Sequence, residues 1–396
     1  MTEEADIPLQ LQRNGFDPSA GLSRAREQAG LAPVTTTFGA AALLVSRYDD
    51  VREVLGASAR FGNDVPLEGD PSLSPAERTR LRTGNLLTKD PPEHTRLRRV
   101  LTPEFTPGRM RRLEARIVDI VDDALESMAK SGRPVDLVTA FALPVPSLVI
   151  CELLGVPFAD RDEFQHRTGR QVDASLPVTQ RMKYQRESRA YMATLVERAR
   201  ADPGDDILGM LVRQHSDDLT DEELVGIASL LLLAGHETTA NMLALGTLAL
   251  LRHPDQLALV RDDPDAIGPA VEEMLRWLTI VPSGATRITR TDVRIGDRNL
   301  AAGEKLLVSL PAANRDPALI DAPDRFDVTR GTTGHLAFGH GLHYCLGAPL
   351  ARMELRTAFP ALLRRFPSLA LAVDFDQVRF RSSHLVYGLR ELPVTW

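Results

Sequence analysis

The sequence lacks several features that would place it in common classes of protein. It has only two cysteines, Cys151 and Cys345, and they lie far apart in its 396 residues. A disulfide framework is therefore not expected, and a reducing cytoplasm is the expected location. The first residues are acidic and do not follow the basic and then apolar order of a signal peptide.

Long apolar runs and an excess of basic charge are also missing. The longest apolar run, around residues 224–234, is interrupted by small residues. It is shorter than the roughly 20 residues that a membrane span needs, so no membrane anchor is expected. The net charge of −7 argues against nucleic acid as a general partner. A chain of this length can bury a large core without disulfides.

Apolar spacing predicts a mainly helical protein with small β-sheets at its edge, in a single domain over residues 1–396. No internal repeat or low-complexity linker divides the chain. Apolar residues recur at helical intervals from Arg109 to Met128. Short strands are expected at residues 42–46, 293–295 and 305–310, and Gly296–Asp297 is expected to turn a hairpin over residues 293–300.

The longest predicted helix is the most informative one. Thr220 and Glu223 form a capping box, and His253–Pro254 ends the helix. Its length of roughly 45 Å would cross the whole molecule, and its apolar surface predicts that it is buried. Its midpoint carries Gly235–His–Glu–Thr–Thr239. A glycine and polar groups are costly there unless the site has a use.

The strongest local pattern is Phe338–Gly–His–Gly–Leu–His–Tyr–Cys–Leu–Gly347. Gly339 and Gly341 allow turns that residues with a Cβ resist, so Cys345 is expected at the end of a tight loop. A helix is expected to follow, and its free N–H groups and dipole would stabilise a thiolate. Gly347 would allow a flat cofactor to approach the backbone. The alternative is a buried structural thiol, the commoner role of a lone cysteine.

This segment resembles the haem-binding signature of the cytochromes P-450 at every fixed position, including Phe338, Gly339 and His343. The resemblance extends over residues 43–396. It implies a cytochrome P-450 fold with haem b between the long helix and the cysteine loop, and Cys345 as the axial iron ligand. A thiolate ligand favours O–O cleavage. Zinc and covalent c-type haem are poor alternatives, because the sequence has no Cys-x-x-Cys pair.

The resemblance also implies roles for residues outside the loop. Thr238 is expected to hydrogen-bond the oxygen that is activated, and Glu237 to belong to a proton-delivery relay. Alternatively, Thr238 is an ordinary helical threonine that bonds the carbonyl four residues earlier. Four basic residues are expected to hold the haem propionates, namely His94, Arg98, Arg287 and His343.

A second charged motif is expected to be structural. Glu273 and Arg276 are three residues apart on a predicted buried helix, so they can pair. The resemblance adds Arg325 to them as the third member of a triad that locks the core. Without the resemblance, such a pair would more often be a solvated surface contact.

As a whole, the resemblance implies a monooxygenase that inserts one atom of O2 into a lipophilic substrate by hydroxylation or epoxidation. Its similarity to actinobacterial enzymes suggests tailoring of polyketides, macrolides or similar natural products, with xenobiotic oxidation as another use. Electrons are expected from a [2Fe-2S] or related ferredoxin with an NAD(P)H-dependent reductase, and the protein is expected to be a monomer. Two alternatives are a peroxide-driven enzyme and a non-catalytic haem-binding or gas-sensing module.

Substrate and partner surfaces can also be assigned from the resemblance. Mostly apolar variable regions at residues 60–87, 164–195, 281–283 and 384–386 suit a medium-sized lipophilic ligand. A basic docking face for an acidic ferredoxin is expected to contain Arg109, Arg111, Arg112, Arg352 and Arg356. Alternatively, these arginines are solvated or pair with Glu104, Glu114 and Glu354.

Overall fold

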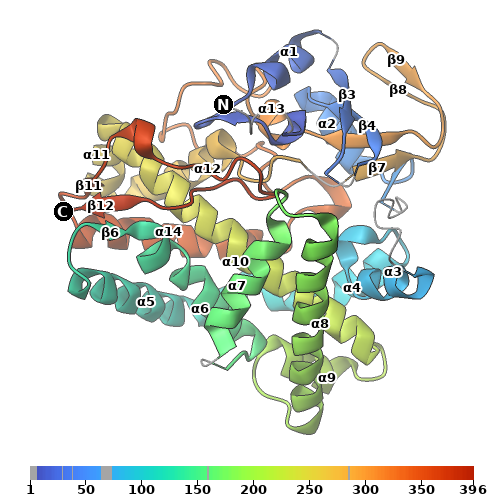
Figure 1. Cartoon of the computed structure of the whole chain (residues 1–396), viewed down its shortest axis with the longest axis horizontal. Helices are drawn as coiled ribbons and strands as arrows, with labels where there is room; N and C mark the ends of the chain where they lie inside the picture. The colour runs from blue at the N-terminus through green and yellow to red at the C-terminus, as the bar shows by residue number, and fades with distance from the viewer. Residues whose placement is uncertain (1–6, 29, 38, 64–73, 158–159, 284–285) are drawn as a thin grey trace.

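A computed structural model describes residues 7–28, 30–37, 39–63, 74–157, 160–283 and 286–396. Helices dominate it and small sheets lie towards one end and the edges, as predicted (Figure 1). The helices are α1 (Ala20–Gln28), α2 (Tyr48–Gly56), α3 (Pro75–Arg82), α4 (Glu93–Leu101), α5 (Pro107–Lys130), α6 (Pro144–Leu154), α7 (Arg161–Val172), α8 (Val178–Ala201), α9 (Ile207–His215), α10 (Asp221–Arg252), α11 (Pro254–Asp262), α12 (Ile267–Leu278), α13 (Leu310–Asn314) and α14 (Ala348–Arg365). The extent of the single predicted domain, residues 1–396, stays a prediction.

The strands form four small sheets. The largest has the order β3-β4-β10-β7-β5, with β10 parallel to β4 and antiparallel to β7. The other sheets have the orders β11-β12-β6, β8-β9 and β1-β2. The strand bounds are β1 (Arg13–Asn14), β2 (Asp17–Pro18), β3 (Leu31–Thr35), β4 (Ala41–Val45), β5 (Phe61–Gly62), β6 (Val135–Asp136), β7 (Thr286–Thr289), β8 (Val293–Ile295), β9 (Arg298–Leu300), β10 (Lys305–Val308), β11 (Ala370–Leu371) and β12 (Pro393–Thr395).

The strand predictions are confirmed with small shifts at the ends. The three predicted strands correspond to β4, β8 and β10. The predicted hairpin is formed by β8 and β9, and Gly296 at its turn has a φ of 54°. Asp297 is not among the described residues with positive φ, so the glycine alone supplies the left-handed conformation.

Helix α10 crosses the middle of the molecule (Figure 1). The predicted capping box is present: the Glu223 N–H donates to the Thr220 hydroxyl, and the Thr220 N–H donates to the Glu223 carboxylate. The helix ends at Arg252 with His253 as its C-cap. It packs against α6, α8, α12 and α14, and its residues from Thr239 to Leu250 are all buried.

The core gathers around this helix. Its largest apolar cluster joins α5, α6, α10, α12 and α14. Contact between α10 and α14 is close at Gly246, where an added Cβ would lie 2.5 Å from the ring of Phe359. No helix among the described residues is long and apolar enough to cross a membrane.

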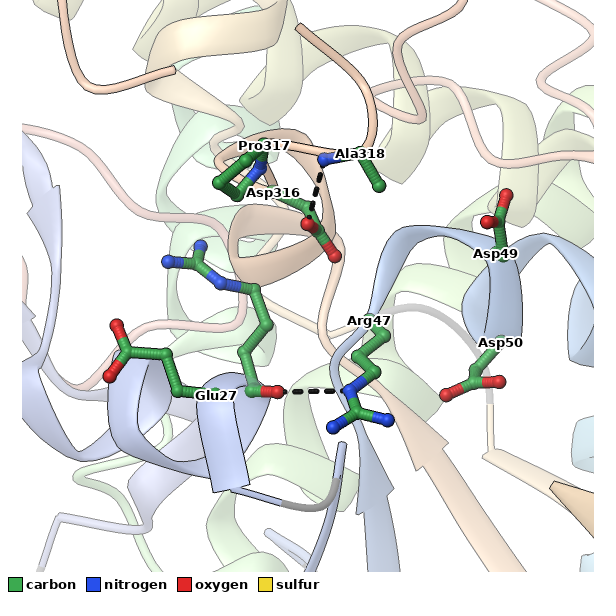
Figure 2. Close-up of a pocket in the computed structure, with 8 residues that line it drawn as sticks. Glu27, Arg47, Asp49, Asp50, Asp316, Pro317 and Ala318 are labelled. Carbon is green, nitrogen blue, oxygen red and sulfur yellow. Dashed lines mark hydrogen bonds between the residues drawn. The ribbon is translucent and has the colours of Figure 1, made fainter. Parts of the chain in front are cut away.

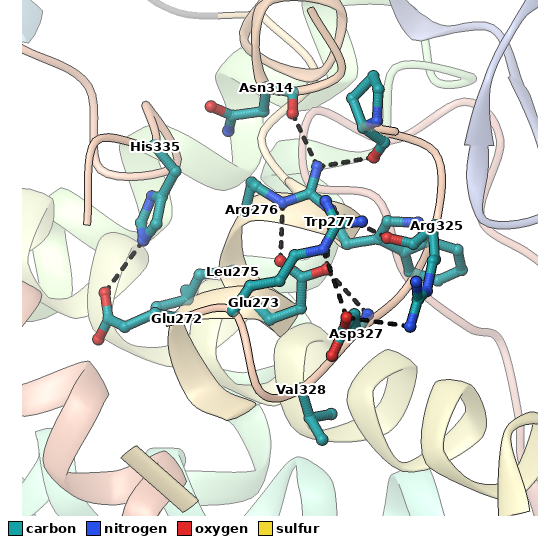
Figure 3. A network of polar contacts seen from close by, with 12 residues as sticks. Glu272, Glu273, Leu275, Arg276, Trp277, Asn314, Arg325, Asp327, Val328 and His335 are labelled. Carbon is teal, nitrogen blue, oxygen red and sulfur yellow. Dashed lines mark hydrogen bonds and ion pairs between the residues drawn. The ribbon is translucent and has the colours of Figure 1, made fainter. Parts of the chain in front are cut away.

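A buried polar network ties α12 to the segment before the cysteine loop (Figure 3). Arg276 donates from Nε and Nη2 to both carboxylate oxygens of Glu273, at 2.7 and 2.8 Å, and neither side chain is exposed. Its guanidinium also donates to the carbonyl oxygens of Asn314, Pro323 and Arg325. These bonds satisfy a charge pair that burial alone would destabilise.

The prediction that Arg325 completes a triad with Glu273 and Arg276 through its side chain is wrong. The side chain of Arg325 turns outward, is 68% exposed and pairs with Asp327 at 3.2 Å. Arg325 takes part through its backbone carbonyl, which accepts from Arg276 at 3.3 Å. The charge of Glu273 is already matched by Arg276 and by the backbone N–H of Asp327, so a third cation is not needed in the core.

Candidate functional site

Cys345 lies in a tight loop directly before α14, as predicted. Gly339 and Gly341 have φ angles of 73° and 71°, in the left-handed region that favours glycine. A Cβ on Gly341 would also lie 2.6 Å from the carbonyl oxygen of Leu55 on α2. The loop closes where the N–H of Cys345 donates to the carbonyl oxygen of Phe338 at 2.9 Å.

The surroundings of the Cys345 sulfur both favour and oppose its charged form. Burial raises the pKa of the thiol, whereas the N–H groups of Gly347 and Ala348 and the charges of Arg98 and Arg352 lower it. The N–H groups at the start of α14 thus act as predicted, but burial outweighs them. A metal cation bound to sulfur overcomes such a penalty, because a coordinating thiol is held deprotonated.

The four predicted propionate residues gather close to this loop. Arg98 on α4 donates to the carbonyl oxygen of Tyr344, next to Cys345, at 2.7 Å. The rings of His94 and His343 lie 4.2 Å apart between centroids. Arg287, on the inward face of β7, is 2% exposed.

This basic cluster (His94, Arg98, Arg287 and His343) is poorly compensated within the protein. Burial lowers the pKa of Arg287 to about 10. Burial, followed by the nearby charges of Arg287 and His94, lowers the pKa of His343 to about 3. Three buried ring nitrogens of this cluster have no hydrogen-bond partner among the described residues: both nitrogens of His94 and the Nδ1 of His343.

Such a cluster fits an anionic ligand. Buried polar groups are normally hydrogen-bonded, and buried cations are normally paired. Asp90, the acid whose charge acts on His94, Arg287 and His343, already accepts from Arg290 at 2.6 Å and from the N–H of Asn63 at 2.8 Å. The free donors beside Cys345 therefore match the carboxylates of a haem, and the residues present fit that cofactor.

Sequence reasoning missed Asn63 at this site. Its side-chain amide contacts the Nε2 of His343. Pairing of β5 with β7, with Gly62 opposite Ile288, places Asn63 next to the strand of Arg287. No sequence motif marks this asparagine, because only the sheet register brings it to the cluster.

The midpoint of α10 presents a second group of predicted residues. Thr238 is half-buried and donates from its hydroxyl to the carbonyl oxygen of Ala234 at 2.6 Å, the contact of an ordinary helical threonine. Ala234 is nevertheless exposed, although the helix is buried on both sides of it. Gly235 has a packing role, since a Cβ there would lie 2.9 Å from Ile150 on α6.

Glu237 is held in a buried polar group. Its Oε2 accepts from Arg381 at 3.4 Å and from Asn241 at 3.3 Å, and its Oε1 lies 3.8 Å from the Nε2 of His236. Sequence reasoning missed Arg381 and Asn241. Arg381 comes from the C-terminal segment, and the close approach of that segment to α10 explains Gly388, where a Cβ would lie 1.6 Å from the Asn241 side chain.

The two groups belong to neighbouring elements. Helices α10 and α14 pack against each other, for example where Gly246 meets the ring of Phe359. Among the hydrogen bonds of the described residues, none joins Thr238 or Glu237 directly to the cysteine loop.

The predicted docking arginines divide into paired and exposed members. Arg109 pairs with Glu104 at 3.0 Å, as the alternative prediction had it. Arg352 is engaged by Glu272 at 2.7 Å rather than by Glu354, which is buried. Arg111 and Arg112 are exposed, and Arg356 is exposed but also contacts Glu272 at 3.4 Å.

A surface pocket elsewhere is a poor candidate for catalysis (Figure 2). Its volume is about 450 Å3, and charged residues such as Arg47, Asp50 and Asp316 line it. It shares no residue with the cysteine loop, the basic cluster or the midpoint of α10. Of the predicted substrate regions, residues 64–73 of the first lie outside the described residues.

Comparison with known proteins assigns relatives along the whole chain. The family model described as cytochrome P450 (P-450) matches residues 34–186 and 178–373. Cytochrome P-450 FAS1 of Rhodococcoides fascians is 50% identical over 400 residues, covering 100% of both chains. Vitamin D(3) 25-hydroxylase of Pseudonocardia autotrophica is 43% identical over 355 residues, covering 89% of this chain and 87% of its own.

Solved structures give the same result. The crystal structure of CYP105P1 in complex with filipin I has a TM-score of 0.91 and 40% identity, covering 97% of each chain. The structure of P-450 StaH, from the biosynthesis of a glycopeptide antibiotic, has a TM-score of 0.87 and 44% identity, covering 98% of this chain and 100% of that one.

Proposed function

Because the chain belongs to the cytochrome P-450 family of monooxygenases, we propose that it uses haem b and O2 to oxidise a medium-sized lipophilic molecule. Cys345 holds the iron through its thiolate. His94, Arg98, Arg287 and His343 bind the propionates, while Phe338 and Gly339 shape the loop around the sulfur. The observation that carries the proposal is the poorly compensated basic cluster beside Cys345.

The bound haem supplies the chemistry that activates dioxygen, and the residues of α10 control protons and water around it. The carboxylate of Glu237 relays protons, and Arg381 and Asn241 orient it. Thr238 releases its bond to Ala234 when its hydroxyl is needed as a donor. A pair of acid and alcohol at this place favours O2 over peroxide as the oxidant.

The reaction is hydroxylation or epoxidation, in the tailoring of a natural product or the oxidation of a xenobiotic. Relatives named for vitamin D(3), filipin I and a glycopeptide antibiotic support a lipophilic or natural-product substrate. Electrons come from a separate ferredoxin, of [2Fe-2S] or related type, and its NAD(P)H-dependent reductase. Both cysteines are free, which agrees with a reducing cytoplasm. The protein acts as a monomer.

The test uses the purified haem-containing protein. The reduced carbon-monoxide spectrum should show thiolate ligation, and a ferredoxin with its reductase should drive NAD(P)H-dependent formation of product. Compounds for that assay come from a lipophilic library screened by the spectral shift on binding. Turnover with peroxide but not with the redox partners would favour the peroxide-driven alternative. A thiolate spectrum without turnover under either condition would favour a non-catalytic haem protein.

A further inference from the structure

Glu272 precedes the core glutamate Glu273 on α12, and its carboxylate serves a different segment (Figure 3). His335 donates from Nε2 to Oε2 of Glu272 at 3.1 Å. Arg352 donates from Nε to Oε1 at 2.7 Å and from Nη2 to Oε2 at 2.8 Å. His335 lies before the Cys345 loop and Arg352 lies after it, so one carboxylate holds both ends of the loop.

The environment of this carboxylate is strongly biased towards its charged form. Its side chain is 9% exposed. Burial alone would raise the pKa of Glu272, but hydrogen bonds from Arg352 and His335 outweigh burial and lower the pKa to about 2. Arg356 adds a longer contact of 3.4 Å. A charged acceptor with a bidentate arginine is among the stronger polar contacts in proteins.

The contact through His335 is continuous with the loop backbone. The N–H of Ala337 donates to Nδ1 of His335 at 3.2 Å, so the ring hydrogen is on Nε2, where it points to Glu272. The next backbone N–H, that of Leu336, donates to the side-chain oxygen of Asn314 at 2.6 Å. The chain entering the loop is therefore fixed at two consecutive residues.

The contact through Arg352 reaches the residues beside the cysteine. Its Nη1 donates to the hydroxyl of Tyr344 at 3.2 Å, and its guanidinium lies 4.6 Å from the centroid of the Phe338 ring. Phe338 in turn accepts the backbone N–H of Cys345. Arg352 thus contacts both the residue that precedes Cys345 and the residue whose carbonyl oxygen accepts the Cys345 N–H.

We infer that Glu272 is a positioning residue that keeps the Cys345 loop in the geometry needed to hold iron, through His335 at one end and Arg352 at the other. This inference rests on the proposed role of Cys345 as the iron ligand. A simple stabilising ion pair would change only the resistance of the whole protein to unfolding. A positioning residue must also change the ligation of the iron while the protein is still folded.

The experiment compares haem-containing wild type with Glu272→Gln and Arg352→Met. In the reduced carbon-monoxide complex, the conversion of the thiolate band to the band of a neutral ligand is followed over time, at a temperature where circular dichroism shows every protein folded. The matched control is Glu222→Gln, because Glu222 on α10 also holds two arginines, Arg80 and Arg189, at 2.8 and 3.0 Å.

We expect both variants at the loop to lose the thiolate band on the order of ten times faster than wild type, which corresponds to about 1.4 kcal/mol in the barrier. In the double variant Glu272→Gln/Arg352→Met the effect should be smaller than the two single effects combined, because both changes break the same contact between Glu272 and Arg352. Wild-type rates in both single variants would overturn the inference. A wild type with haem but without a thiolate band would overturn the proposed ligation, and the inference with it.

Discussion

Arg381 donates from Nη1 to Oε2 of Glu237 at 3.4 Å, so the C-terminal segment supplies the cation that faces the acid at the midpoint of α10. The side chains are 16% and 3% exposed. Water therefore competes little for this carboxylate, and its orientation depends on Arg381 together with Asn241.

Replacing this arginine should impair proton delivery. In Arg381→Met, Glu237 loses its cationic partner, so we expect the product formed per NAD(P)H consumed to fall on the order of tenfold. This is less than the roughly 100-fold or more that a positioned acid contributes to a rate, because Glu237 itself remains. Arg379→Met is the control, because Arg379 is exposed and makes only a long contact of 3.9 Å, with Glu391. Equal coupling in the two variants would show that Arg381 does not orient the acid.

Thr238 can be separated from an ordinary helical threonine by a matched substitution on the same helix. Thr247 makes the same bond to the carbonyl four residues earlier, at 2.8 Å, but is fully buried. We expect Thr238→Ala to keep consuming NAD(P)H while more of the oxygen leaves as peroxide, and Thr247→Ala to remain coupled. The ratio of product to NAD(P)H measures the difference. An unchanged ratio in Thr238→Ala would leave this residue with the helical role alone.

The identity of the iron ligand can be tested at Cys345. Cys345→His should retain haem through the basic cluster but lose the thiolate spectrum and the oxygenation of substrate, because a neutral imidazole does not supply the electron density of a thiolate. Cys151→Ser, at the other free cysteine, should keep both properties. Monooxygenase turnover in Cys345→His would contradict the assignment.

The sequence predicted most of the features that depend on residues close together in the chain. The capping box at Thr220, the glycine turns at Gly339 and Gly341 and the buried pair of Glu273 and Arg276 are all present, because each depends on residues a few positions apart. The family signature extended this knowledge to the fold as a whole.

Contacts between distant segments could not be predicted in the same way. Asn63 reaches His343 through the register of β5 on β7, and Arg381 reaches Glu237 through the path of the C-terminal segment. Neither residue lies in a motif. The outward side chain of Arg325 shows the converse, since the expected motif is present but its backbone, not its charge, makes the contact.

Glu354 on α14 should make stability depend on pH. Burial raises the pKa of its carboxyl to about 8 from a value of 4.5 when unfolded. Between these values the unfolded chain releases a proton that the folded protein keeps, so folding is favoured less as pH rises. The loss is complete above the folded pKa and is at most roughly 5 kcal/mol, at about 1.4 kcal/mol per pKa unit.

The substitution Glu354→Gln removes this titration. We expect wild type to lose free energy of unfolding relative to the variant as the pH is raised from 5 to 8. Urea unfolding of the haem-containing proteins at several pH values measures the difference. A difference between wild type and variant that stays constant over this range would show that Glu354 is not held neutral in the folded protein.

The proposed docking face for a ferredoxin is restricted by the structure to the exposed arginines. Arg109 and Arg352 are paired with acids, whereas Arg111 and Arg112 on α5 are exposed, and α5 packs against α14, the helix that follows the cysteine loop. Leu342, in the loop itself, is 40% exposed and adds an apolar contact. Charge on α5 would steer an acidic partner, and Leu342 would offer it an apolar contact in the loop of Cys345.

Reversing the charge of Arg111 and Arg112 together should weaken this docking. We expect ferredoxin-driven turnover to fall several-fold and its dependence on salt to flatten, because exposed charges are screened beyond ~10 Å at 0.1 M ionic strength. Substrate-binding spectra should not change, since neither residue belongs to the haem site. The control reverses Arg294 and Arg298, which are exposed on the β8–β9 hairpin. If turnover ignores both salt and the reversal on α5, the partner binds another face.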